Sequence, residues 1–173
     1  MPSIQKKICL LGDFAVGKTS LVRRFVQGIF EDKYLSTVGV KVDRKSLLIS
    51  TEAQTVELTM LVWDLAGGEK FDHVMNSYYR GSAGAVLVCD LTRTETLPVL
   101  TQYARDFWSI NPHTPLLIVG NKVDLAEQRA IPDANLDDVA VQLQVSWFVS
   151  SAKTGENVER IFQTLGQHIL AMP

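Results

Sequence analysis

The chain contains the stretch ICLLGDFAVGKT at residues 8–19. From Gly12 to Thr19 it matches the pattern G-x-x-x-x-G-K-[ST] at every fixed position. An apolar run typical of a buried strand precedes the pattern at residues 4–11, and a helical pattern follows it at residues 18–27. A glycine-rich turn between a strand and a helix lets backbone N–H groups wrap a polyphosphate, because side chains are absent where the phosphates approach. The stretch therefore predicts a nucleotide-phosphate loop.

Two side chains at the end of this loop have the chemistry that a metal-bound polyphosphate requires. Lys18 supplies a positive charge for the terminal phosphates, and Thr19 presents a hydroxyl to Mg²⁺. The helix that follows aims its N-terminal N–H groups and its dipole at the same anion. We therefore expect nucleotide and Mg²⁺ to bind together at this loop.

Short apolar runs alternate with amphipathic stretches along the rest of the chain. Strands are predicted at residues 4–11, 38–49, 56–62, 85–89, 116–119 and 147–149. Helices are predicted at residues 18–27, 96–110, 134–144 and 158–169, the last with Thr154 as its N-cap. This alternation predicts an α/β fold, in which a mainly parallel sheet carries helices on both faces and binds ligands at the carboxyl ends of its strands. With no repeat, low-complexity tract or linker in the sequence, we expect one domain over residues 1–173.

The composition argues against several classes of function. The chain has 173 residues and a formal net charge of -2, so a surface for nucleic acid is not expected. No apolar stretch reaches the ~18 residues of a membrane span. Cys9 and Cys89 each lie in an apolar run, which is typical of reduced core residues in a cytoplasmic protein. The two ends offer no myristoylation or prenylation site, so we expect membrane recruitment only through a lipidated tail or a partner outside this chain.

Two further segments have the chemistry to recognise a base. Asn121-Lys122-Val123-Asp124 follows one predicted strand and Ser151-Ala152-Lys153 follows another. The Asp124 carboxylate can accept the N1–H and the exocyclic amine of guanine together, whereas adenine has no such donor pair. Asn121 can tie neighbouring loops together, the stem of Lys122 can cover the ring face, and the Ala152 N–H can meet the guanine carbonyl. The two segments therefore favour guanine over adenine.

These motifs, in this order, resemble those of the small GTPases of the Ras superfamily, and most of all its Rab branch. The similarity covers about residues 4–170 and rests on residues 12–19, 34–40, 63–67, 78–81, 121–124 and 151–153. It implies a three-layer P-loop G domain: a mostly parallel six-stranded sheet with one antiparallel edge strand and about five helices. It also implies a molecular switch that binds GTP with Mg²⁺, binds GDP and hydrolyses GTP.

The resemblance assigns further roles by position. Phe30 would stack on the guanine face, Thr37 would contact Mg²⁺ and the γ-phosphate, Asp64 would hold Mg²⁺ through water, and the Gly67 N–H would contact the γ-phosphate. The implied metal residues are thus Thr19, Thr37 and Asp64, and the implied catalytic positions are Lys18, Thr37, Gly67 and Gly68. The implied nucleotide-binding residues are Asp13, Phe14, Ala15, Val16, Gly17, Lys18, Thr19, Ser20, Phe30, Tyr34, Thr37, Gly67, Asn121, Lys122, Asp124, Leu125, Ser151, Ala152 and Lys153.

Two segments have the character of nucleotide-dependent switches. Residues 30–38 are polar and poorly periodic, and residues 67–79 begin with two glycines. Both should relax when the γ-phosphate is lost, because that phosphate orders Thr37 and Gly67. Effectors, an exchange factor and an activating protein are expected on residues 30–80. Trp63 and Tyr78 match two members of the aromatic triad that Rab proteins present to effectors, whereas Val42 replaces the third; core packing is the alternative for this group.

Two residues depart from the family pattern. Gly68 stands where the family has the Gln that orients the attacking water, and Phe14 stands where the family usually has a small residue, close to the path of an arginine finger. We therefore expect slow intrinsic hydrolysis and a poor response to an arginine-finger activator. Glu69, His73 or a Gln supplied by a partner are candidate substitutes, and a hinge is the alternative role of Gly68.

Two other functions stay open at this point. The first is a GTP-loaded interaction scaffold whose hydrolysis is essentially lost, which Gly68 and Phe14 support. The second is a P-loop kinase or ATPase, against which Asp124 and the lack of a second substrate lid argue.

Overall fold

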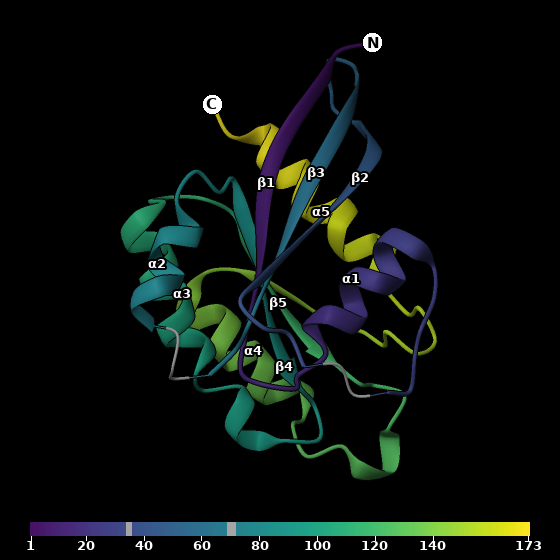
Figure 1. The fold of residues 1–173 in the computed structure, drawn as a ribbon, viewed down its shortest axis with the longest axis vertical. Coiled ribbons are helices and arrows are strands. Elements are labelled where there is room, and N and C mark those ends of the chain that lie inside the picture. The colour runs from purple at the N-terminus through teal and green to yellow at the C-terminus, as the bar shows by residue number, and fades with distance from the viewer. Residues whose placement is uncertain (34–35, 69–71) are drawn as a thin grey trace.

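The computed structural model describes residues 1–33, 36–68 and 72–173, without the side chains of residues 72–74. A six-stranded sheet in the order β2-β3-β1-β4-β5-β6 forms its centre (Figure 1). β2 pairs antiparallel with β3 at the edge, and the β1–β3, β1–β4, β4–β5 and β5–β6 pairings are parallel. This arrangement confirms the predicted fold class. The strands are β1 (Ser3–Leu11), β2 (Val40–Ser50), β3 (Thr55–Leu65), β4 (Gly84–Asp90), β5 (Leu116–Asn121) and β6 (Ser146–Val149).

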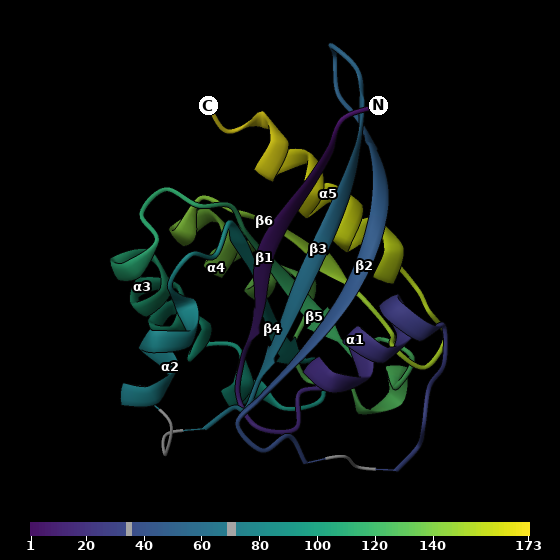
Figure 2. The same ribbon diagram turned by 45° about the horizontal axis from the view of Figure 1, so that its top comes forward.

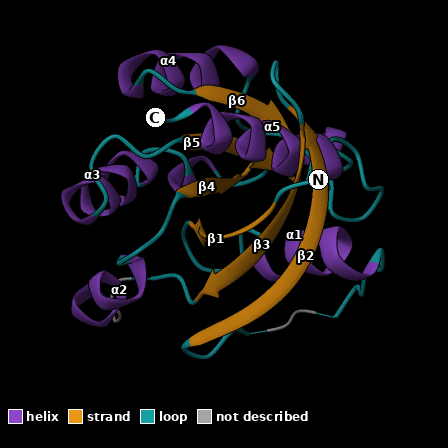
Figure 3. Ribbon diagram, turned by 90° about the horizontal axis from the view of Figure 1, so that it is seen from above, coloured by secondary structure: helices purple, strands orange, loops and turns teal. Residues whose placement is uncertain are grey.

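Helices cover both faces of the sheet. They are α1 (Lys18–Gln27), α2 (Asp72–Tyr79), α3 (Leu100–Ile110), α4 (Asp133–Leu143) and α5 (Val158–Ala171), with short 3₁₀ turns η2 (Thr94–Thr96) and η3 (Ala126–Gln128). Figure 3 shows α1 and α5 on one side of the sheet and α2, α3 and α4 on the other. The loops after β1, β4 and β5 lie at one end of the sheet, opposite both chain termini (Figures 1 and 2). No helix of the described residues is both long and apolar enough to cross a bilayer.

α1 is held at both ends and along its buried face. It begins after Gly17, which has φ +100°, and ends at Gly28, which has φ +71° and donates its N–H to the Arg24 carbonyl oxygen. Glycine favours these left-handed conformations, which explains the sharp helix boundaries. Phe25 stacks on Phe162 of α5 with ring centroids 3.8 Å apart. This packing fixes α1, and hence the loop before it, against the sheet.

One predicted helix start and one predicted N-cap are wrong. The helix predicted from residue 96 begins at Leu100, because the buried Thr96 hydroxyl accepts the Asp90 N–H at 2.9 Å and donates to the Arg93 carbonyl at 2.7 Å. Those bonds tie the 3₁₀ turn to the end of β4. Thr154 does not cap α5, whose N-cap is Asn157. Thr154 lies instead in a turn closed by the Gly155 N–H, which donates to the Ser151 carbonyl at 2.8 Å.

Candidate nucleotide-binding site

Glycines allow three loops to meet at the carboxyl end of the sheet. A Cβ atom on Gly17 would lie 2.3 Å from the Nδ2 atom of Asn121. A Cβ atom on Gly67 would lie 2.5 Å from the Gly12 carbonyl oxygen. Both distances exclude a side chain, so the loops after β1, β3 and β5 come together only because glycine occupies these positions.

Lys18, the first residue of α1, is a buried cation that points back across the loop. It is 7% exposed, and its Nζ atom donates to the Gly12 and Asp13 carbonyl oxygens, both at 2.8 Å. Burial lowers the pKa of Lys18 to about 8, against the opposing effects of the Asp64 and Asp13 carboxylates. Phosphate oxygens would restore the stabilisation that burial removes from this ammonium group, so the site favours a polyanion.

Three oxygen-bearing side chains gather beside the loop. The Thr19 hydroxyl donates to the Oδ2 atom of Asp64 at 2.6 Å and is hydrogen-bonded to the Thr37 hydroxyl. Asp64 is 1% exposed, and its Oδ1 atom has no hydrogen-bond partner within the described part of the chain. Burial raises the pKa of Asp64, although the Thr19 hydrogen bond and the Lys18 charge oppose the shift. A buried, unpartnered carboxylate oxygen next to two hydroxyls is a hard-oxygen donor set, so these residues fit Mg²⁺.

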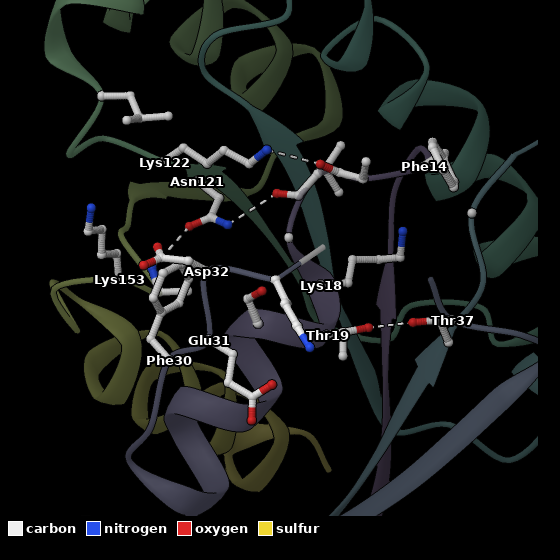
Figure 4. Close-up of a pocket in the computed structure, with 18 of the residues that line it drawn as sticks. Phe14, Lys18, Thr19, Phe30, Glu31, Asp32, Thr37, Asn121, Lys122 and Lys153 are labelled. Atoms are coloured by element: carbon white, nitrogen blue, oxygen red, sulfur yellow. Dashed lines mark hydrogen bonds between the residues drawn. The ribbon is translucent and has the colours of Figure 1, made fainter. Parts of the chain in front are cut away.

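The segment after β5 bonds directly to the phosphate loop. Asn121 donates from Nδ2 to the Val16 carbonyl oxygen at 3.1 Å, and Lys122 donates from Nζ to the Ala15 carbonyl oxygen at 3.1 Å. Figure 4 marks both bonds as dashed lines. They fix the separation between the base-recognition segment and the phosphate loop.

Asp124 is oriented from the loop after β6. The Ser151 hydroxyl donates to the Oδ1 atom of Asp124 at 2.7 Å, and Asp124 lines the cavity. The Ala152 N–H makes only a long contact of 3.4 Å with the Oδ1 atom of Asn121, which leaves it able to donate to a ligand carbonyl. A carboxylate and an amide N–H presented together match the donor and acceptor edge of guanine.

These loops enclose a cavity of about 320 Å³. Figure 4 shows Phe30 and Lys153 at one end and Lys18, Thr37 and Phe14 toward the other. An aromatic ring thus lies at the base-recognition end, and a buried cation with hydroxyls lies at the phosphate-loop end. The arrangement suits a ligand with a flat base at one end and phosphates at the other.

The structure brings the expected nucleotide-binding residues together. All of them line this cavity except Asp13, Tyr34 and Ser151. Asp13 and Ser151 lie directly behind the lining, where they bond to Lys18 and Asp124, and Tyr34 lies outside the described residues. Further residues line the cavity although no motif in the sequence points to them, and the first three directly follow Phe30 along the chain: Glu31, Asp32, Lys33 and Leu65.

Gly68 has room for a side chain but not the backbone for one. Among the described residues no atom lies within 4 Å of a Cβ placed on it, yet its φ is +105°. Its N–H donates to the Tyr103 hydroxyl at 3.4 Å. A longer residue at position 68 would therefore either hold this left-handed conformation, at a cost of about 1–3 kcal/mol, or change its backbone conformation. Glu69 and the side chain of His73, the expected substitutes for the absent Gln, lie outside the described residues.

Phe14 is fixed by its backbone at the phosphate end of the cavity. Phe14 is 52% exposed. Its N–H donates to the Asp13 carboxylate at 2.7 Å, and its carbonyl accepts from Arg93 at 2.8 Å. The aromatic side chain is therefore held close to where the terminal phosphates are expected.

The expected effector residues lie together on β2, β3 and α2. Val42 and Trp63 are directly opposite each other in the β2–β3 register, and the Trp63 and Tyr78 rings have centroids 6.2 Å apart. Val42 is 47% exposed, and Trp63 is half-buried beneath the Lys7 ammonium, 3.7 Å from its ring centroid. The group is therefore partly exposed, while its two aromatic residues also pack against the core, so the structure leaves both the effector and the core-packing interpretation in place.

Comparison with known proteins agrees with this geometry. Residues 7–171 match the Ras family. The chain is 35% identical to Ras-related protein Rab-31 of Rattus norvegicus over 94% of its own length and 82% of that protein. It is 37% identical to Ras-related protein Rab-4 of Dictyostelium discoideum over 90% and 75% of the two chains, and 36% identical to GTP-binding protein YPTM1 of Zea mays over 94% and 77%. The chain belongs to the Ras family and is a Rab-like small GTPase.

Proposed function

We propose that this protein is a guanine-nucleotide switch that binds GTP with Mg²⁺, binds GDP, hydrolyses GTP slowly, and signals through segments 30–38 and 67–79. One observation carries the proposal: Asp124 and Lys18 face the same cavity, and their loops are joined by direct hydrogen bonds from Asn121 and Lys122. A single ligand can therefore satisfy a guanine-selective carboxylate and a phosphate-binding lysine at once.

The chemistry follows from groups already in place. Mg²⁺, when bound with the nucleotide, would neutralise developing phosphate charge, and Thr19, Thr37 and, through water, Asp64 would hold it. The Lys18 ammonium stabilises negative charge on the transferred phosphoryl group, because it is buried and needs no reorganisation. Position 68 supplies no side chain to orient the attacking water, so we expect a slow hydrolysis step.

The switch mechanism rests on two contacts at the phosphate loop. Thr37 is hydrogen-bonded to Thr19, and Gly67 packs against the Gly12 carbonyl. Each contact belongs to one proposed switch segment. A γ-phosphate that bonds to both would order both segments, and its loss would release them together. Val42 and Trp63 lie between these segments in sequence and Tyr78 lies near the end of the second, and we place effector, exchange-factor and activator contacts on residues 30–80.

Titration calorimetry with Mg²⁺ tests the proposal. We expect GDP and GTP to bind at least 100-fold more tightly than ADP and ATP, because a wrong base leaves the Asp124 carboxylate unpaired. Equal affinity for guanine and adenine nucleotides would overturn the proposal.

A GTP-loaded scaffold is the second candidate, and Gly68 with Phe14 favours it. Chromatography of the nucleotide released from purified protein separates the two: mostly GDP supports turnover, and mostly GTP supports the scaffold. For either function we place the protein in the cytoplasm, because Cys9 and Cys89 are both buried and form no disulfide.

A further inference from the structure

Arg24 on α1 makes contacts that the phosphate and base motifs do not account for. Its Nε atom donates to the Ala152 carbonyl at 2.8 Å, and its Nη2 atom donates to the Lys153 carbonyl. Its Nη1 atom donates to the Gly28 carbonyl at 3.2 Å. Arg24 is not among the residues that line the nucleotide cavity, so its role must be exerted through these carbonyls.

The carbonyls that Arg24 binds lie in the base loop and directly before the first switch segment. Ala152 and Lys153 form the loop that faces the base, and the Ala152 N–H is the donor we assign to the guanine carbonyl. Gly28 ends α1 directly before the segment that carries Phe30. One side chain therefore joins the base loop to the helix that starts at Lys18 and to the entrance of the first switch segment.

Arginine is suited to this task by its shape. Its planar guanidinium offers five N–H donors in a fixed fork, so it can serve carbonyls from two chain segments at once. The base loop also closes over the side chain, because a Cβ on Gly155 would lie 3.7 Å from the Arg24 Cδ atom. A lysine side chain has a single nitrogen and cannot reproduce this set of bonds.

We propose that Arg24 is a positioning residue for guanine recognition: it holds the Ala152–Lys153 peptide so that the Ala152 N–H meets the base, and thereby slows nucleotide release. The inference rests on the proposed function, since it requires guanine to occupy the cavity. The base loop is then held in place by a side chain of α1, and not only by bonds within the loop.

The test compares two ligands in four proteins. The proteins are wild type, Arg24→Gln, Arg24→Lys and the control Arg105→Gln, which removes the same charge from an exposed position on α3. The ligands are GDP and the diphosphate of 2-aminopurine riboside, which lacks the carbonyl oxygen that Ala152 would bind. The analogue also lacks the N1–H that Asp124 would accept, a loss that is the same in all four proteins. Affinities come from calorimetry, and dissociation rates come from displacement of a fluorescent GDP.

We expect Arg24→Gln to weaken GDP binding and speed its release about tenfold, while it weakens binding of the 2-aminopurine nucleotide much less. The preference for GDP over the analogue should therefore shrink. Arg24→Lys should shrink it as well, although the charge is kept, and Arg105→Gln should match wild type. A merely structural role would weaken both ligands equally and leave the preference unchanged.

An unchanged preference in the Arg24 variants would overturn the inference, even if both ligands bound less tightly. Melting temperatures without nucleotide report folding, and if Arg24→Gln does not fold, the Arg24→Lys preference decides. A wild type that does not prefer GDP to ADP would defeat the proposed function itself. If the wild type prefers GDP to ADP, but the Arg24 variants keep the wild-type preference for GDP over the 2-aminopurine nucleotide, only this inference fails.

Discussion

The Nζ atom of Lys122 lies 2.8 Å from the Oδ2 atom of Asp90, the last residue of β4, which is fully buried. The other oxygen of this carboxylate accepts the Thr92 N–H at 2.9 Å and the Thr92 hydroxyl at 2.7 Å. Lys122 also donates to the Ala15 carbonyl. Asp90 therefore holds the lysine of the base segment against the phosphate loop.

Removing this charge should loosen both loops. We expect Asp90→Asn to lower the free energy of unfolding by about 1–3 kcal/mol, because a buried carboxylate loses its ion pair with Lys122, and to weaken GDP binding about tenfold. Denaturant unfolding and calorimetry measure the two effects. The control is Glu95→Gln, since Glu95 pairs with Arg93 at the exposed surface of η2, where such pairs contribute about 0–1 kcal/mol. Equal effects of the two substitutions would show that Asp90 has no special role.

The buried ammonium of Lys18 makes a prediction about pH. Its pKa in the folded, nucleotide-free protein is lowered to about 8 from 10.5. Between these values the unfolded chain binds more protons than the folded chain, so the Lys18 contribution to the free energy of unfolding rises with pH from about 8 toward 10. Lys18→Met lacks this contribution.

The comparison with Lys18→Met isolates the effect from other groups that titrate in alkali. The difference in unfolding free energy, variant minus wild type, should fall as the pH is raised from 7 to 10 without nucleotide. Denaturant titrations at several pH values measure it. A difference that stays constant over this interval would mean that the Lys18 pKa is not lowered.

Much of the fold is readable from local patterns. The aliphatic run of β4 is buried along its whole length, and α1 begins and ends where the phosphate-loop motif and the helical period predict. The motif residues of the site are also local signals, because their spacing is imposed by a ligand that contacts the backbone. Such features do not depend on which distant residue packs against them.

The missed features arise from contacts between distant segments. α2 follows two glycines in a stretch with little helical periodicity, so the sequence offered no helix signal there. Thr96 looks like a helix start but is drawn to Asp90 and Arg93. Asp90 and Arg24 carry no motif: one ends a buried strand and the other lies on an amphipathic helix, and only the folded chain brings them to Lys122 and Ala152.

Base specificity should follow the chemistry of position 124. Asp124→Asn replaces an acceptor with a group that can donate, so it should weaken GDP binding by at least 100-fold and improve binding of xanthosine diphosphate, whose ring has a carbonyl in place of the amine. Competition with fluorescent GDP measures both affinities. Asp138→Asn, which changes an exposed carboxylate on α4, serves as the control and should alter neither affinity. If the Asp124→Asn protein kept its preference for GDP, Asp124 would have no part in base recognition.

The hydrolysis step should be limited at positions 68 and 14. Single-turnover hydrolysis of GTP with Mg²⁺ should accelerate in at least one of Gly68→Gln, which restores a side chain to orient water, and Phe14→Gly, which clears the phosphate end. The φ of +105° at Gly68 is unfavourable for glutamine. Gly68→Gln should therefore accelerate hydrolysis less than a glutamine in a relaxed backbone conformation would.

Phe14→Gly should have a larger effect in the presence of an activator than alone. An arginine finger contributes roughly 10³–10⁵ in rate, and the exposed Phe14 ring lies at the phosphate end of the cavity that such a finger must reach. Val141→Gly, which removes an exposed side chain from α4, is the matched control and should leave the rates unaltered. If both Gly68→Gln and Phe14→Gly hydrolyse GTP at the wild-type rate, with and without activator, then neither residue limits the reaction, and the proposed slow step must lie in another part of the switch.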